Sequence, residues 1–344
     1  MKIGILTFHW ATNYGAVLQC YALQQFLEKK GHHVEIINYK PEKFDFSWKR
    51  YFRHPFSIRY IKRDYIQNKK ESLLTVFRNT YLNLTKRYSL YRELEEISSE
   101  YDVVISGSDQ VLNPSFTISG EGCPTPTYYL KFVKDDILKI GYAVSFGCTN
   151  YPNVAYEEAK SWISSFDKIG VRENTGKDIL ASFDFQKEIK VVPDPTILQG
   201  RGLFDKITVV KPKVEDYLCV YILRRNIKVE AKTNIVYIDE TNHPVSMEEW
   251  LGYISYSNGL ITNSYHGMIM AILFHIPFVI LLEKEGSVGM NDRFTTLLMR
   301  LELIDRIAST EEMMDVILAN KINWDYVDSK MNEYKNIGES FLDL

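Results

Sequence analysis

The chain has 344 residues, of which 45% are hydrophobic and 25% are charged. These proportions are typical of a soluble globular protein, and the length suggests two domains of about 150 to 190 residues. The formal net charge of −3 argues against a protein whose whole surface binds nucleic acid.

Cysteine spacing and apolar runs bear on the compartment. The four cysteines show no CxxC spacing, so neither a zinc site nor a disulfide framework is indicated, and a reducing cytosol fits best. The N-terminus has no signal-peptide layout, and the longest apolar run, 268–282, is broken by His275 and Pro277. We therefore expect a cytoplasmic protein that does not span the membrane.

The first forty residues predict a βαβ unit. Residues 2–8 form a continuous apolar run, as in a buried parallel strand, and 33–39 form the next strand. Between them a helix is indicated by an apolar stripe and by Gly31 as its stop. The residues of the stripe are Ala16, Cys20, Leu23 and Leu27.

Further strands follow along the chain, most with polar or Gly/Pro-containing segments after them. In the first half we predict strands at 102–106, 139–146, 168–171 and 189–192, and in the second half at 217–223, 234–239, 259–263 and 278–282. This repetition describes open α/β sheets whose functional loops follow the strand ends.

Residues 199–216 read as a linker between two Rossmann-like domains, 1–198 and 199–344, which face each other across a cleft. Ser246 and Glu249 have capping-box spacing and predict a helix that ends near Ser257. After Arg293 the chain reads as helical, and its C-terminal helices are expected to cross back onto the first domain.

Segment 41–92 does not follow the βαβ rhythm. It holds thirteen Lys or Arg against four Asp or Glu, interleaved with aromatic residues. One interpretation is a basic-aromatic patch that rests on anionic lipid or holds an acidic glycan. The other is a helical insertion with a solvated cationic face. The aromatic residues are Phe44, Phe46, Trp48, Tyr51, Phe52, Phe56, Tyr60 and Tyr65.

His266 is the strongest candidate for chemistry. It lies where the strand GLITN turns into an apolar helix, which is where open α/β sheets bind ligands. Backbone N–H groups at a helix N-terminus attract anions. Gly267 removes a side chain where a ligand would need close approach. His266 therefore suits a substrate that carries negative charge.

Six segments in register carry a resemblance to a known family. They are KIGILTFHWATNYGAVLQCYALQQFL, VVISGSDQVLNP, YAVSFG, KIGVRE, VVPDPT and NSYHGMIMAILFHIPFVIL. In these segments the chain resembles the polysaccharide pyruvyl transferases. The resemblance implies a GT-B-like α/β fold, with two Rossmann-like domains around a central cleft.

The resemblance also implies the family's reaction. In that reaction the enolpyruvyl carbons of phosphoenolpyruvate are transferred to a sugar as a ketal, and phosphate is released. That chemistry needs a general acid near carbon 3 and cations or helix-terminal donors for the carboxylate and phosphate. It requires no redox cofactor, and the chain has no GxGxxG or P-loop. We expect phosphoenolpyruvate as co-substrate and no metal.

By this resemblance His266 is the general acid, with Ser264, Tyr265 and Gly267 beside it on the donor side. Other members have Arg-Leu-His where this chain has Ser264-Tyr265-His266, so another cation must hold the donor. Arg172 matches the family's donor-binding arginine, and its alternative is a local ion pair with Glu173. Arg293 is a second candidate, expected to open a helix at the same crevice. Arg224 and Arg225 are weaker candidates or solvated loop residues.

The acceptor side is predicted from two loops of the first domain. Asn13, Tyr14 and Gly15 follow the opening strand, where they contact acceptor hydroxyls or form a tight turn. Ser108, Asp109 and Gln110 follow the strand DVVIS, and Asp109 either orients or deprotonates a sugar hydroxyl or caps the next helix. Asp194 is interpreted as structural at the domain edge. His9 is a weak second acid–base candidate.

Three functions remain open from the sequence. The leading one is a pyruvyl transferase acting on a sugar or lipid-linked saccharide of a capsule or exopolysaccharide. The others are a GT-B glycosyltransferase that uses a nucleotide sugar and a non-catalytic glycan-binding relative. Nucleic acid is not an expected partner. Peripheral contact with the inner face of the cell membrane stays open.

Overall fold

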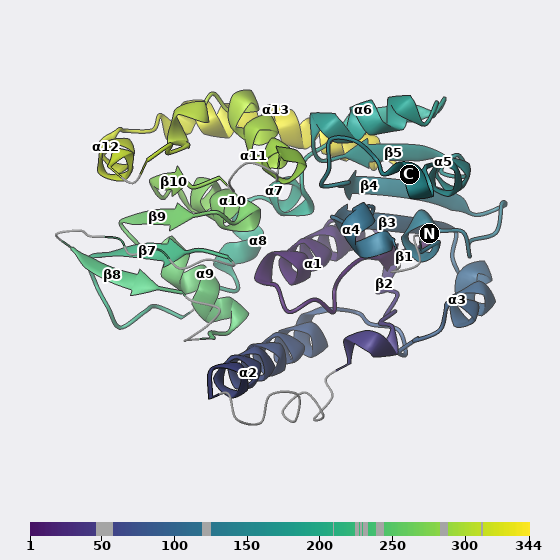
Figure 1. Cartoon of the computed structure of the whole chain (residues 1–344), viewed down its shortest axis with the longest axis horizontal. Coiled ribbons are helices and arrows are strands. Elements are labelled where there is room, and N and C mark those ends of the chain that lie inside the picture. Colours follow the sequence, from purple (N-terminus) through teal and green to yellow (C-terminus); the bar gives the residue numbers. More distant parts are fainter. Residues whose placement is uncertain are drawn as a thin grey trace.

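Two parallel β-sheets with helices packed on them make up the molecule (Figure 1). The computed structural model describes residues 1–45, 58–118, 125–208, 210–223, 227, 229, 233–238, 244–282, 288–310 and 312–344. Within the described residues, the apolar runs of the sequence form parallel strands, as predicted, and most of these strands are buried, whereas β6 and β8 are partly exposed.

The first sheet has the strand order β2-β1-β3-β4-β5-β6, and the second has the order β10-β9-β7-β8. All the strand pairings are parallel. The strands are β1 (Lys2–Leu6), β2 (His33–Ile36), β3 (Val103–Asp109), β4 (Leu138–Val144), β5 (Lys168–Val171), β6 (Glu188–Val191), β7 (Tyr217–Tyr221), β8 (Asn234–Tyr237), β9 (Gly259–Thr262) and β10 (Phe278–Ile280).

The helices connect the strands and extend beyond the second sheet to the C-terminus. They are α1 (Tyr14–Lys29), α2 (Ile58–Tyr81), α3 (Tyr91–Ile97), α4 (Pro114–Thr117), α5 (Tyr156–Ile163), α6 (Asn174–Ser182), α7 (Pro195–Gln199), α8 (Arg201–Asp205), α9 (Met247–Ser255), α10 (Tyr265–Phe274), α11 (Val288–Arg300), α12 (Met313–Ala319) and α13 (Trp324–Phe341).

Helix ends follow the signals in the sequence. The Asn13 side chain accepts a hydrogen bond from Ala16 N and begins α1, and Gly31, with a φ of 89°, follows its end. Ser246 and Glu249 form the predicted capping box of α9. These local bonds satisfy backbone N–H groups that a helix terminus would otherwise leave without partners.

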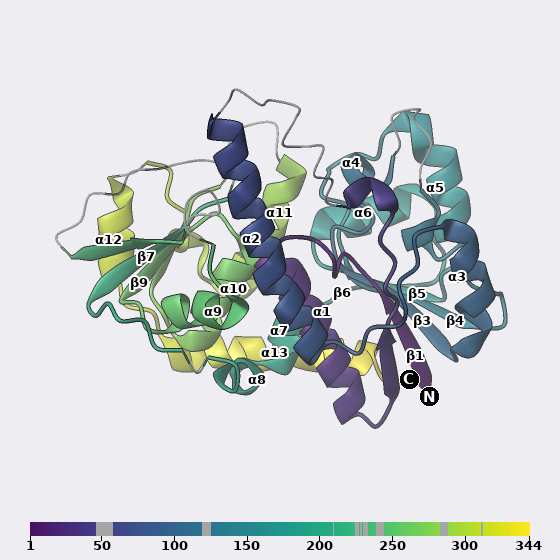
Figure 2. The ribbon, with the colours of Figure 1, turned by 90° about the horizontal axis from the view of Figure 1, so that it is seen from below.

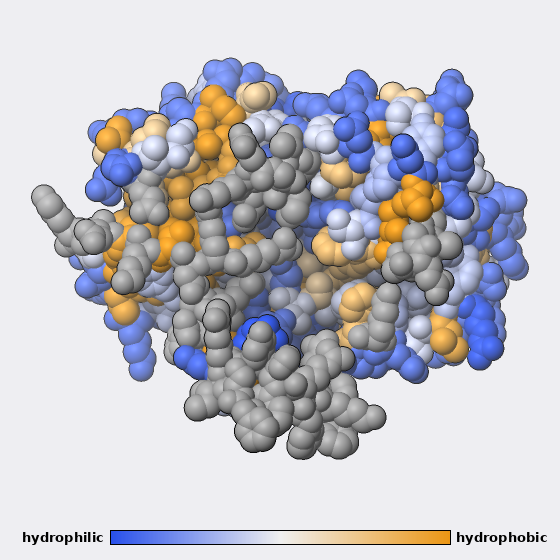
Figure 3. All heavy atoms as spheres, in the orientation of Figure 1, coloured by the Kyte–Doolittle hydropathy of each residue, from blue (hydrophilic) through white to orange (hydrophobic). Residues whose placement is uncertain are grey.

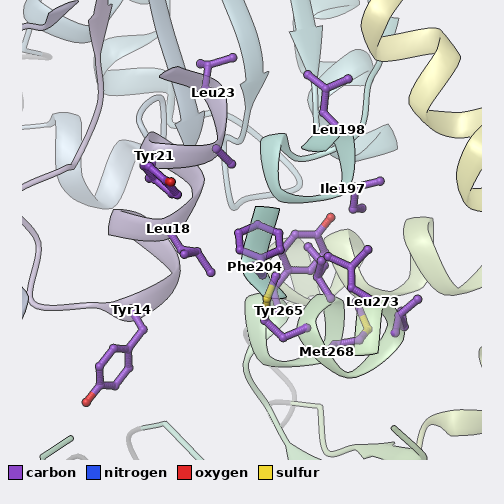
Figure 4. Packing of buried hydrophobic residues seen from close by; sticks show 14 of the residues in the cluster. Tyr14, Leu18, Tyr21, Leu23, Ile197, Leu198, Phe204, Tyr265, Met268 and Leu273 are labelled. Atoms are coloured by element: carbon purple, nitrogen blue, oxygen red, sulfur yellow. The ribbon is translucent and has the colours of Figure 1, made fainter. Parts of the chain in front are cut away.

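One hydrophobic cluster joins the two halves of the molecule. Figure 4 shows side chains of α1, α7, α8 and α10 converging, with Leu18 and Phe204 directed toward Tyr265 and Met268. Helix α10 is buried along its whole length because both faces are covered by protein. The N-terminal turns of α1 and α10 are thereby brought together.

Helix α13 runs along both halves (Figures 1 and 2). Near its start, the Trp324 ring stacks on His275 at the end of α10. Near its end, Phe341 is buried beside Tyr142 of β4, and Lys168 Nζ donates a hydrogen bond to its carbonyl oxygen. The C-terminal helix therefore packs against the first sheet, although it follows the second in sequence.

Two expectations about element boundaries were wrong. The predicted linker 199–216 begins with the last residue of α7 and contains α8, because Phe204 is buried and anchors the segment in the core. The predicted strand 102–106 continues to Asp109. The proposed boundary between residues 198 and 199 lies inside α7, and the division into two domains stays a prediction.

The described part of segment 41–92 is mainly helical. Helix α2 lies beside α1 and reaches α9 (Figure 2). Its cationic face is not wholly solvated: Lys70 is buried with Nζ 4.3 Å from the centre of the Tyr14 ring, and the buried Arg78 pairs with Glu71. Phe46, Trp48, Tyr51, Phe52 and Phe56 lie outside the described residues, as do Arg224 and Arg225.

The surface is mixed in character. Figure 3 shows hydrophobic residues reaching the front face on both halves, among hydrophilic ones. Across the described ranges, no helix is both long and apolar enough to cross a membrane. Cys20, Cys148 and Cys219 are free thiols, and Cys123 lies outside the described residues.

Candidate active site

A cavity of about 610 Å³ is lined by residues of both halves. Its walls come from loops after the carboxyl ends of β1, β3 and β9 and from α11, which is the edge where open α/β sheets bind ligands. The polar and charged lining includes Asn13, Asp109, Gln110, Asn263, Ser264, His266 and Arg293. The aromatic lining includes Phe8, Trp10, Tyr39, Phe44, Phe116, Tyr128, Tyr265 and Phe294.

His266 is the second residue of α10 and lines this cavity. Ser264 caps the helix by accepting a hydrogen bond from Gly267 N at 3.2 Å. The His266 side chain is only 7% exposed, and its Nε2 lies 3.4 Å from Asp194 Oδ2. The ring is therefore buried at the start of the helix, with one edge facing a carboxylate.

Gly15 of α1 lies against the other edge of the His266 ring. A Cβ atom at Gly15 would come within 2.1 Å of His266 Nδ1. Glycine is therefore required at this position of α1 for the ring to occupy its place. Asn13 and Ala16, on either side of Gly15, line the cavity. The Nδ1 edge of the ring thus faces the first half of the molecule, and the Nε2 edge faces Asp194.

Asp194 joins the two halves of the site. Its Oδ1 accepts hydrogen bonds from Thr196 N and Thr196 Oγ1 and so caps α7. Its Oδ2 lies 3.0 Å from Arg172 Nη2 and 3.4 Å from His266 Nε2. Burial alone would raise the pKa of Asp194, but the charges of Arg172 and His266 hold that pKa well below its ordinary value of 3.8. Asp194 is therefore ionised.

Arg172 lies at the end of β5 and is completely buried. Besides Asp194, its guanidinium contacts Ser108 Oγ at 2.6 Å and Asp109 Oδ1 at 3.6 Å. The expected alternative, an ion pair with Glu173, is absent from the described residues. Arg172 does not line the cavity. Arg172 is therefore paired with two carboxylates, Asp194 and the cavity-lining Asp109.

Arg293 is the arginine that lines the cavity. It is the sixth residue of α11 rather than the residue that opens the helix. Its guanidinium carbon lies 5.6 Å from the centre of the Tyr265 ring, and that of Arg172 lies 5.1 Å from the same ring. No ion pair joins Arg293 to a carboxylate within the described ranges, and Nε is buried without a hydrogen-bond partner there. Burial, together with the like charge of Arg172, lowers the pKa of Arg293.

Glu173 is a buried carboxyl group that the sequence interpretation treated only as a partner for Arg172. It lies just before α6, and neither of its carboxylate oxygens has a hydrogen-bond partner among the described residues. Burial raises the pKa of Glu173 to about 7, although the charges of Arg172 and Arg293 act in the opposite direction. A buried acid that titrates near neutral pH therefore follows Arg172 in the chain, although it does not line the cavity.

The comparison with known proteins decides the family. The model of the family "Polysaccharide pyruvyl transferase" matches residues 13–284, which is most of the chain. The chain belongs to the polysaccharide pyruvyl transferase family. No match was found among curated protein sequences.

Solved structures show the fold of this pyruvyl transferase family member. It superimposes on UDP-GlcNAc 2-epimerase from Methanocaldococcus jannaschii with a TM-score of 0.52 and 12% identity, over 99% of each chain. UDP-GlcNAc 2-epimerase from Neisseria meningitidis aligns over 100% of both chains, with a TM-score of 0.45 and 9% identity. The expected α/β fold of the GT-B type is confirmed.

On the acceptor side of this family member, the predicted residues divide into two groups. Asp109 and Gln110 line the cavity, as does Asn13, which also caps α1. Asp109 does not cap the following helix; Asn113 caps α4. Ser108 lies below the cavity, with its hydroxyl 3.3 Å from Asp194 Oδ2.

Tyr14 was wrongly expected at the acceptor side. It is the first residue of α1, not part of the loop, and its ring stacks on Trp250 with a centroid distance of 5.3 Å. Its hydroxyl donates a hydrogen bond to Val245 O at 2.7 Å. Gly15 likewise contacts the His266 ring and does not line the cavity. Both residues connect the two halves.

The structure also places two further residues that the sequence singled out, Gly267 and Asp194. A Cβ at Gly267 would meet Thr262, Ser264 and Tyr221 at 3.1 to 3.3 Å, so Gly267 serves packing of α10 on the sheet and not close approach of a ligand. Asp194 caps α7, as a structural residue would, but it also contacts His266. Its position after β6, on the same sheet edge as Arg172, was the available signal.

His9 is not an acid–base residue of this cavity. Its ring nitrogens lie 3.2 Å from Thr7 O and 3.0 Å from Asn38 Oδ1, and it does not line the cavity. Burial lowers the pKa of His9 to about 4, so the ring is neutral near pH 7. His266 is the histidine that the cavity presents.

Proposed function

We propose that this protein transfers the enolpyruvyl group of phosphoenolpyruvate to two hydroxyls of a saccharide, with His266 as general acid. A proton adds to carbon 3 of the enol, and carbon 2 gains oxocarbenium character. One saccharide hydroxyl bonds to carbon 2 and loses its proton. The bond from carbon 2 to the phosphate oxygen then breaks, and the second hydroxyl adds and loses its proton to close the ketal. Phosphate is released.

The observation that carries this proposal is the pairing of His266 with Asp194 at the cavity wall. Asp194 is ionised, and its Oδ2 lies 3.4 Å from Nε2, which is buried and has no hydrogen-bond partner among the described residues, so the contact is electrostatic. We assign proton donation to Nδ1, because Nε2 is buried beside Asp194 whereas Nδ1 lies on the opposite edge of the ring, toward α1.

The anionic donor is proposed to lie between Arg293 and the start of α10. Arg293 lines the cavity without a carboxylate partner among the described residues, so its charge is available to a ligand. The first turn of α10 offers backbone N–H groups, which attract anions. Together they offset the absence of an arginine at Ser264, whose hydroxyl caps the helix.

Asp109 is the proposed base for the saccharide hydroxyl. It lines the cavity at the end of β3, and its Oδ1 lies 3.6 Å from Arg172 Nη1. A carboxylate at this position can accept a proton from an alcohol as the oxygen–carbon bond forms. His266 and Asp109 belong to opposite halves, so the reaction would take place between them.

Donor choice tests this function. Calorimetric titration with phosphoenolpyruvate should show binding, whereas UDP- and GDP-sugars should not compete. Binding of a nucleotide sugar alone would favour a GT-B glycosyltransferase and exclude the pyruvyl reaction. Binding of saccharide alone would leave only a non-catalytic glycan-binding role.

The acid role has a separate test. In His266→Ala, saccharide-dependent phosphate release should fall by about 10² to 10⁴-fold while phosphoenolpyruvate still binds. His33→Ala, at an exposed position of β2, is the control and should keep full activity. Full activity in His266→Ala would refute the assignment.

A further inference from the structure

The aromatic end of the cavity has no role in the donor chemistry. It is built by the first half of the molecule from Phe8, Trp10, Phe44, Phe116 and Tyr128. His266 and Arg293 belong to the second half. At about 610 Å³ the cavity has the size of a site for a drug-sized ligand, so a second ligand fits beside a small anionic donor.

The aromatic rings form one continuous wall around Phe8. The centre of the Phe8 ring lies 5.8 Å from that of Trp10, 5.9 Å from that of Phe116 and 4.7 Å from that of Tyr128. Phe44 extends the wall, with its centroid 4.6 Å from that of Trp10. Phe116 is 52% exposed, so part of its ring surface remains open for contact.

Polar groups border this wall. Gln110 lines the cavity, and since its Oε1 accepts from Asn113 Nδ2, its amide N–H groups are left as donors toward the cavity. Asp109, Ser115 and Thr125 add a carboxylate and two hydroxyls. Flat rings next to amide and hydroxyl groups match a ligand with a C–H face and a hydroxyl edge. A lipid chain would not use the polar groups.

The charges of the lining residues narrow the class of ligand further. Among the lining residues that the structure describes, the only Lys or Arg is Arg293, and it lies against Tyr265 and Phe294 in the second half. An anionic group at the aromatic wall would therefore find no lysine or arginine among the described lining residues of the first half, and it would face Asp109. A neutral ligand needs no counter-charge and is not disfavoured by the carboxylate of Asp109.

We propose that the aromatic wall is the acceptor subsite and binds a neutral saccharide, which stacks its C–H face on Trp10 and Phe116 and turns its hydroxyls toward Gln110 and Asp109. This assignment rests on the proposed function only in calling the saccharide the acceptor. Because the wall and His266 share one cavity, a hydroxyl of the stacked ring would meet the donor at the junction of the two halves.

Calorimetry with matched sugars tests the proposal. The probes are methyl glycosides of neutral hexoses and the corresponding hexuronates, titrated with and without phosphoenolpyruvate. Neutral glycosides should bind more tightly than the hexuronates. Phe116→Ala should weaken neutral binding by roughly 2- to 12-fold, the range expected for one aromatic contact. Trp10→Ala should weaken it at least as much. Phosphoenolpyruvate affinity should be unchanged in Phe116→Ala.

Tyr256→Ala is the matched control, because Tyr256 is 46% exposed and lies away from the cavity. It should bind neutral glycosides like the wild type. The proposal is overturned if no neutral glycoside binds, if hexuronates bind more tightly, or if the Phe116 and Trp10 variants bind glycoside normally. If glycoside binding depends on the wall but phosphoenolpyruvate does not bind, the donor chemistry fails while this subsite stands.

Discussion

Asp194 stays ionised in a buried position because Arg172 and His266 meet the same carboxylate oxygen. Its folded-state pKa lies below the ordinary value of 3.8. The ionised form therefore stabilises the fold in full above about pH 4, and this stability is lost as the pH falls through the lowered folded-state pKa. Neutralising Asp194 should remove this contribution and release the His266 ring.

We predict that Asp194→Asn lowers the free energy of unfolding at pH 7 by about 3 kcal/mol, the cost of breaking a buried pair. The difference from wild type should shrink as the pH falls below 4. Urea denaturation at pH 7 and at lower pH measures this. Asp205→Asn, which breaks an exposed pair with Arg201, is the control and should cost well under 1 kcal/mol. Equal losses in both variants would contradict the prediction.

The contribution of Glu173 to stability depends on pH in the opposite direction to that of Asp194. Its folded-state pKa of about 7 lies above the ordinary 4.5, so the folded protein holds a proton that the unfolded chain has lost at pH 6. Stability associated with Glu173 is therefore present below pH 4.5 and is lost as the pH rises through about 7.

Glu173→Gln should remove the loss of stability that the wild type shows as the pH rises. Between pH 4.5 and pH 8 the variant should gain stability relative to wild type on the order of 3 kcal/mol. Thermal unfolding measured across that range tests it, with Glu157→Gln, exposed on α5, as the control. A pH-independent difference between Glu173→Gln and wild type would show that Glu173 does not titrate in this window.

At the scale of elements, the site depends on the contact between the first turns of α1 and α10. Gly15→Ala should favour the α1 helix, since alanine is the better helix former. Yet its Cβ would lie 2.1 Å from His266 Nδ1, so the ring or the helix must move. We predict a fall in kcat of about tenfold or more with phosphoenolpyruvate affinity largely retained.

Gly202→Ala on α8 is the control for Gly15→Ala, because a Cβ there meets nothing within 4 Å. It should leave activity and stability close to wild type. Steady-state kinetics and donor calorimetry on the two variants separate a displaced ring from a general loss of fold. Wild-type kcat in Gly15→Ala would mean that the His266 ring tolerates the shift.

Elements with a strong local signal were predictable. Continuous apolar runs located β1, β5 and β9, and the Ser246 capping box located α9, because burial and capping act over a few neighbouring residues. Helix α8 was missed, since its burial depends on Phe204 meeting a core formed by distant segments.

The residues of the candidate site likewise divide into those with a local signal in the sequence and those without one. His266 was found from the strand-to-helix junction, a local feature. The Asp194–His266 contact and the aromatic wall were not, because they join residues far apart in sequence, such as Phe8, Phe44 and Phe116. Arg172 was assigned to the donor from the family resemblance, but only the three-dimensional arrangement shows that it is paired with Asp194 and Asp109.

At the scale of the whole molecule, Tyr14 links three elements across the two halves. Its ring stacks on Trp250 of α9 at an interplanar angle of 10°, and Lys70 of α2 lies over it. Its hydroxyl donates to Val245 O, just before α9. Since Tyr14 directly precedes Gly15, the same turn that joins the halves also sets the His266 ring.

Tyr14→Ala should therefore destabilise both halves together, by about 3 to 5 kcal/mol for loss of a buried aromatic ring. Tyr14→Phe keeps the ring and loses the two hydrogen bonds that the hydroxyl makes with Val245 O and Val245 N, at a cost of about 2 kcal/mol. Urea unfolding followed by far-UV circular dichroism and by tryptophan fluorescence should give coincident transitions, shifted together in Tyr14→Ala. Separate transitions for the two signals in the wild type would mean that the halves unfold independently. A Tyr14→Phe loss as large as that of Tyr14→Ala would mean that the hydroxyl, and not the stacked ring, holds them together.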